Sequence, residues 1–145
     1  MKPRHLIVPS CALALLAACA TPADQAAPVA APSPTPTMTE VSAFHPRVVL
    51  AHEGGLTTVD ASTGATLAAT PLDGFVRLND AGDGRHVLLT QGDRFRVFDG
   101  ALTAGRHGDH AHYFAGTPRL TDTSYEAPKA GHVVAHGGHT TLFGD

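Results

Sequence analysis

Residues 107–112 are the part of the chain whose side chains are best suited to chemistry. Three imidazoles and a carboxylate fall within these six positions, namely His107, Asp109, His110 and His112. In an extended segment the side-chain period is two, so His110 and His112 point to the same side. His107 lies across a glycine and can fold back toward them. Neutral imidazole and carboxylate are ligands that zinc prefers, so the hexapeptide predicts a metal site. The alternative is a solvated loop in a chain that has ten histidines.

Short strands are the elements that must position this hexapeptide. From Phe44 onward, runs of β-branched and aromatic residues alternate with turns that contain glycine. No segment has a sustained apolar period of 3.6 residues, and 15 glycines with 11 prolines suit tight turns better than a helical bundle. The sequence predicts an all-β domain, with strands at 47–51, 56–60, 65–72, 75–78, 86–90 and 94–99.

The strand pattern also repeats along the chain. The segment 86–99 recurs at 132–145, and an earlier copy runs over 48–60. Short strands that recur every 40–46 residues or so are typical of a β-propeller, whereas a β-sandwich would need no repeat. A propeller has at least four blades of roughly 40–50 residues each. We therefore expect residues 44–145 to be the N-terminal portion of a propeller, about two to three blades of a longer ring.

The repeat separates candidate ligands from structural histidines. His86 and His132 occupy the same place in two copies, which favours a structural role for both. The counterpart of His136 is Thr90, so this histidine is special to its copy, and it could meet the 107–112 cluster from a neighbouring blade. Asp109 is a ligand or an acceptor that orients an imidazole N–H, and the alternative is an ordinary loop aspartate that shapes the turn at Gly108.

The first 18 residues are expected to form a signal peptide. Lys2 and Arg4 precede an apolar stretch, residues 6–18, that is too short to span a bilayer. The stretch ends in residues 16–19, which resemble a bacterial lipobox. That resemblance implies cleavage before Cys19, lipidation of Cys19 and an extracytoplasmic, membrane-anchored protein. An ordinary secretory signal cut among the nearby alanines is the alternative.

Residues 19–43 are predicted to be a disordered tether. They contain five prolines among alanines and threonines and lack the large apolar residues that a core needs. They also contain no histidine.

Composition and motif content argue against several other functions. The net charge is −3 and there is no basic stripe, which argues against a nucleic-acid partner. There is no GxSxG nucleophile motif and no phosphate-binding loop. Three histidines and a water could form a hydrolytic zinc site, but no residue is identified as its general base. We therefore expect a protein that is not an enzyme.

Several segments resemble the AztD-type zinc metallochaperones, which are extracytoplasmic β-propeller proteins. The resemblance covers residues 46–145, and its most specific part is the histidine hexapeptide. The matching segments are 71–75, 78–79, 82–87, 107–113 and 131–138.

This resemblance implies a function and a partner. His107, His110 and His112 fall on the histidine motif of the family, and His136 falls on a later matching histidine. The implied cargo is Zn²⁺, and the implied partner is the solute-binding protein of a zinc ABC importer. Two alternatives remain open: a propeller scaffold that binds a protein or glycan, and a zinc hydrolase.

Overall fold

The computed structural model describes residues 36–145, and all of their regular structure is β. This range contains no helix and hence none that is long and apolar enough to cross a membrane. The expected strands between residues 47 and 99 are confirmed, except that the strand expected at 75–78 runs over 77–80. The predicted signal peptide, Cys19 and residues 19–35 lie outside the described residues. The strands are β1 (Thr39–Val41), β2 (Arg47–His52), β3 (Gly55–Asp60), β4 (Thr66–Pro71), β5 (Arg77–Asp80), β6 (His86–Gln91), β7 (Arg94–Asp99), β8 (Leu102–His107), β9 (His110–Ala115), β10 (Arg119–Glu126), β11 (Val133–His136) and β12 (His139–Leu142).

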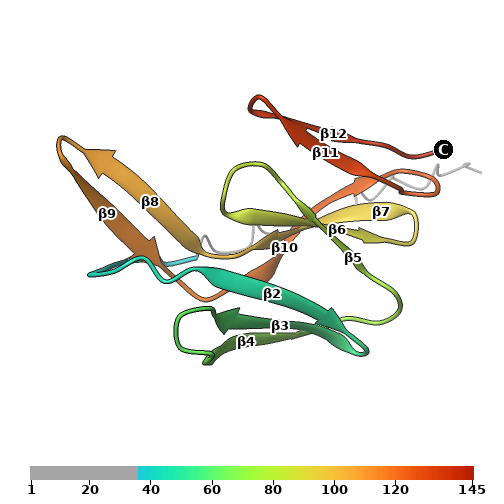
Figure 1. Cartoon of the computed structure of the whole chain (residues 1–145). Coiled ribbons are helices and arrows are strands. Elements are labelled where there is room, and N and C mark those ends of the chain that lie inside the picture. The colour runs from blue at the N-terminus through green and yellow to red at the C-terminus, as the bar shows by residue number, and fades with distance from the viewer. Residues whose placement is uncertain (1–35) are drawn as a thin grey trace, which may run out of the picture. The chain divides into compact units, whose positions relative to one another are not determined.

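These strands form four small antiparallel sheets (Figure 1). Their orders are β2-β3-β4, β10-β7-β6-β5, β11-β12 and β1-β9-β8. The three copies of the sequence repeat are the hairpins β2–β3, β6–β7 and β11–β12, each in a different sheet. The predicted repeat is thus confirmed as a repeat of hairpins.

The aspartate that recurs in the first two copies closes the turn after its hairpin. The Asp60 carboxylate accepts hydrogen bonds from the backbone N–H groups of Ser62 at 2.8 Å and Thr63 at 3.0 Å. Asp99 accepts one from the Ala101 N–H at 2.7 Å. A short polar side chain that satisfies backbone donors in this way favours a turn.

The core joins the first two repeat sheets. Leu56 of β3 and Leu72 after β4 pack with Leu89 of β6 and Phe98 of β7, and each is at most 7% exposed. Removing such side chains from water is the main favourable contribution to folding. The two sheets are therefore packed against each other through a shared core, from which the other segments extend.

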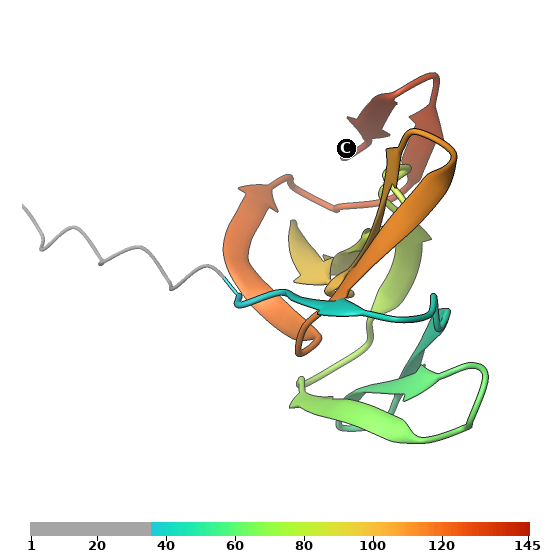
Figure 2. The same ribbon diagram turned by 90° about the vertical axis from the view of Figure 1, so that its left-hand side faces the viewer.

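The hairpin that carries the histidine hexapeptide is an insertion into the four-stranded sheet. Strands β7 and β10 pair directly, yet β8 and β9 lie between them in sequence. The chain thus leaves this sheet after β7, forms the β8–β9 hairpin and returns as β10. Figure 2 shows the hairpin as a two-stranded ribbon with a tight turn.

Strand β1 corrects the predicted boundary of the tether. Residues 39–41 fall within the segment 19–43 that is predicted to be disordered, but they form a strand that pairs antiparallel with β9. The hydrogen-bonding groups of β9 on the side away from β8 are available to a neighbouring strand, and Thr39 and Val41 are of types that favour strands. Within the described residues, regular structure therefore begins at Thr39, before Phe44.

Candidate metal centre

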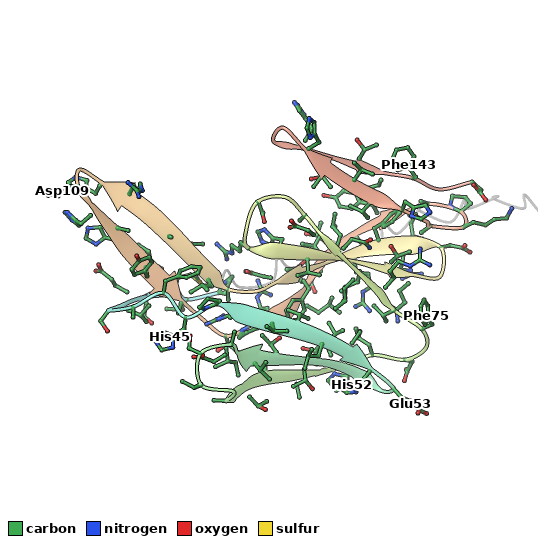
Figure 3. The ribbon with its side chains drawn as sticks, in the orientation of Figure 1. His45, His52, Glu53, Phe75, Asp109 and Phe143 are labelled. Atoms are coloured by element: carbon green, nitrogen blue, oxygen red, sulfur yellow. The ribbon has the colours of Figure 1, made fainter. Side chains whose placement is uncertain are left out.

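The centre is built on the turn of the β8–β9 hairpin. His107 ends β8, His110 begins β9, and the two are directly paired across the strands. Gly108 and Asp109 form the loop between them, and Figure 3 shows Asp109 at its tip. Gly108 has a φ of +62°, whereas Asp109 has a negative φ. This pattern is typical of the type II′ turn, which suits the twist of a two-residue hairpin.

The hairpin register brings the three imidazoles onto one face. Directly opposed residues share a face of a sheet, and so do residues two apart on a strand, so His107, His110 and His112 point to the same side. Their ring centroids are 4.8–6.3 Å apart. One ligand atom from each ring lies within 4.8 Å of the others. Gly105 is opposite His112 on β8, and a Cβ at this position would contact nothing within 4 Å.

Two carboxylates fix the orientation of two of these rings. His112 Nδ1 lies 2.5 Å from Glu40 Oε1, and His110 Nδ1 lies 3.1 Å from Asp109 Oδ1. An ionised carboxylate can only accept a hydrogen bond, so each Nδ1 carries the hydrogen. In both rings Nε2 is thereby left as the nitrogen that can bind a metal.

The two Nε2 atoms lie 2.9 Å apart. Two imidazole nitrogens on a tetrahedral zinc ion, each about 2.0–2.1 Å from it, are roughly 3.3 Å apart. A small separation of these two rings would therefore let both bind the ion, and His107, whose ligand atom lies within 4.8 Å of the others, would complete the set by moving closer. Since His107 and His110 are exposed and His112 is half-buried, a further ligand can reach the ion from outside.

The structure brings together three of the five predicted metal residues. His107, His110 and His112 form the group, and their roles as ligands stay a prediction. Asp109 contacts His110 from a fully exposed position, which suits the supporting role more directly than the ligand role. His136 is paired with His139 at the turn of the β11–β12 hairpin and is not in the group.

Glu40 is the residue that sequence reasoning missed. It is 72 residues from His112 in sequence and lies in the predicted tether, which contains no histidine. Its only local signal is the alternation of Thr39, Glu40 and Val41, which is too short to predict a strand. The contact depends on the pairing of β1 with β9.

His86 lies outside the group and has a structural partner. Its Nδ1 is 2.5 Å from Asp83 Oδ2, in the loop that precedes β6. Burial raises the pKa of the Asp83 carboxyl, but hydrogen bonds from the His86 ring and from the backbone N–H groups of His86 and Arg85 outweigh it and lower this pKa to about 2. This contact agrees with the structural role expected from the repeat.

The hairpin repeats and their small successive sheets define the chain as part of a β-propeller. Solved structures of AztD from Citrobacter koseri share this fold. The crystal structure of that protein matches with a TM-score of 0.57 and 23% identity, over 63% of this chain and 25% of the other. The structure of the apo form matches with a TM-score of 0.58 and 21% identity, over 68% and 27%.

These matches confirm the predicted partial propeller and place the resemblance at the level of the fold. The chain spans about a quarter of the length of the AztD chains. A scan of protein families and a search of curated proteins each found no match.

Proposed function

We propose that this protein is an extracytoplasmic zinc-binding metallochaperone that delivers zinc to the solute-binding protein of a zinc ABC importer. The observation that carries the proposal is the convergence of three imidazoles on one face of an exposed hairpin tip. The structural likeness to AztD and the resemblance of the hexapeptide to the AztD-type motif support the same function.

The position of the cluster suits a site that must give up its cargo. A metal held by three side chains at the end of a hairpin can be approached by the ligands of a partner, which replace one imidazole at a time. A fully enclosed site would need a larger structural change for the same exchange. A water could complete the coordination until the partner arrives.

A zinc titration of the full-length protein, in competition with a chromophoric chelator, tests the binding step. We expect tight binding by the wild type and its loss in the His110→Ala/His112→Ala double variant. The control is His45→Ala/His52→Ala, which also removes two imidazoles, since these residues pair with Asp60 and Thr57 instead. Unchanged binding in the first variant would refute the ligand assignment. A separate His136→Ala variant tests the remaining predicted histidine.

Transfer and anchoring need their own measurements. Zinc-loaded protein mixed with a purified solute-binding protein should lose its zinc to that partner faster than zinc dissociates into a chelator of equal strength.

Cys19→Ser should move the protein from the membrane fraction to the soluble extracytoplasmic fraction, because the acyl chains are lost. Zinc-dependent ester or amide hydrolysis would instead favour the hydrolase alternative, and an absence of tight zinc binding would favour the scaffold.

A further inference from the structure

The segment 37–44, here called the N-terminal strap, is docked on the outer edge of β9. Its strand β1 contributes three paired residues, and the Thr39 hydroxyl donates to the Ala115 carbonyl at 3.2 Å. The Phe44 ring contacts that of Tyr113 at a centroid distance of 5.6 Å. This is a small set of contacts, and a short edge strand held by few of them opens at low free-energy cost.

Glu40 is the charged residue of the strap, and it lies on the same face as the histidine cluster. It is paired with Phe114, and His112 is two residues from Phe114 on β9, so all three side chains share one face of the sheet. The diagonal neighbours Glu40 and His112 then meet at 2.5 Å. The strap is thereby connected to the candidate metal centre through one side chain.

We propose that Glu40 is a positioning residue for His112 and that it couples metal capture to docking of the strap. The inference rests on the proposed function. The carboxylate holds the Nδ1–H, which turns Nε2 toward the other imidazoles and makes it a better donor to a metal. In return, a metal on Nε2 makes the Nδ1–H a stronger hydrogen-bond donor. The hydrogen bond from His112 to Glu40 becomes stronger, and it stabilises the docked strap.

The coupling must be reciprocal. If a docked strap raises metal affinity by some factor, bound metal raises the docking equilibrium of the strap by the same factor. Zinc should therefore hold β1 against β9. A partner protein that lifts the strap away would separate Glu40 from His112 and weaken zinc binding, which gives a route to release at the moment of contact.

The first arm of the test measures zinc affinity by chelator competition on the full-length protein. Loss of a carboxylate that supports a histidine ligand costs about 10–100-fold in metal affinity, so Glu40→Ala should weaken binding to that extent. Glu40→Gln keeps an acceptor oxygen without the charge and should be affected less. The control Glu53→Ala removes the same charge from the exposed β2–β3 turn and should bind like the wild type.

The second arm measures amide hydrogen exchange with and without zinc. In the wild type, zinc should slow exchange in residues 39–41 and 113–115. In Glu40→Ala at saturating zinc, residues 39–41 should keep the fast exchange of the metal-free protein. A merely structural role for Glu40 would change exchange equally with and without zinc, and that result would overturn the inference.

The outcomes also separate this inference from the proposed function. If the wild type binds no zinc tightly, the proposed function fails. If the wild type binds zinc through His110 and His112 but Glu40→Ala binds it equally well, only the role of Glu40 is refuted.

Discussion

At the scale of single residues, the two carboxylates beside the cluster differ in how firmly they can hold an imidazole. Glu40 extends from a paired strand and lies 2.5 Å from His112 Nδ1. Asp109 lies in the turn, is fully exposed and is 3.1 Å from the ring of the adjacent His110. The Asp109 carboxylate is fully exposed, whereas that of Glu40 is 58% exposed, so water screens the interaction of Asp109 more strongly.

We therefore expect Asp109→Ala to weaken zinc binding less than Glu40→Ala does. The comparison is made by chelator competition on the two variants under the same conditions. Asp109→Asn separates charge from shape and should lie between Asp109→Ala and the wild type. A loss in Asp109→Ala as large as that in His110→Ala would mean that Asp109 coordinates the metal directly.

At the scale of elements, the β8–β9 hairpin positions the three histidines of the candidate site. The face shared by the three imidazoles follows from the pairing of His107 with His110, and this pairing depends on the two-residue turn. Gly108 supplies the positive φ that the turn requires, and a side chain there would be strained even though a Cβ would contact nothing within 4 Å.

Gly108→Ala should therefore weaken zinc binding although Gly108 offers no ligand. The strain of a non-glycine residue at this φ is of order 1 kcal/mol, and it would be relieved by a change in the turn that misaligns His107 and His110. The matched control is Gly105→Ala in the same hairpin, where φ is not positive and a Cβ also has free space. Calorimetric zinc titrations of both variants make the comparison, and equal affinities would contradict the role given to the turn.

Elements of this chain could be predicted where the information is local. Alternating apolar residues and glycine turns predict β2 to β7, and the spacing within 107–112 predicts a cluster that the hairpin forms. Strand β1 and Glu40 could not be predicted in this way, because three residues carry too little pattern and their partner strand begins about 70 residues later in the chain. The position of His136 relative to the cluster depends on how blades are arranged, which is also non-local information.

At the scale of the whole molecule, stability depends on buried charge as well as on the apolar core. Asp99 is 2% exposed, and Arg85 holds its carboxylate with two hydrogen bonds of 2.7 and 2.6 Å. Burial raises the pKa of Asp99, but the hydrogen bond from Arg85, that from the Ala101 N–H and the Arg85 charge together lower it. Asp99 ends β7 and Arg85 precedes β6. This ion pair therefore stabilises the four-stranded sheet β10-β7-β6-β5, from which the β8–β9 hairpin extends.

Acid should therefore unfold the protein through Asp99 and Asp83. Both carboxyls have a lower pKa in the folded chain, about 2 for Asp83, than the 3.8 of an unperturbed aspartate. Between the folded and unfolded values the unfolded chain binds more protons, so the free energy of unfolding decreases as pH falls. The contribution is complete above about pH 4 and is lost as pH falls toward 2 and below. Urea unfolding between pH 2 and pH 6 should show this slope, and Asp83→Asn should reduce it, because one of the contributing groups no longer titrates. A slope in Asp83→Asn equal to that of the wild type would mean that the hydrogen bonds to the Asp83 carboxylate do not contribute to folding.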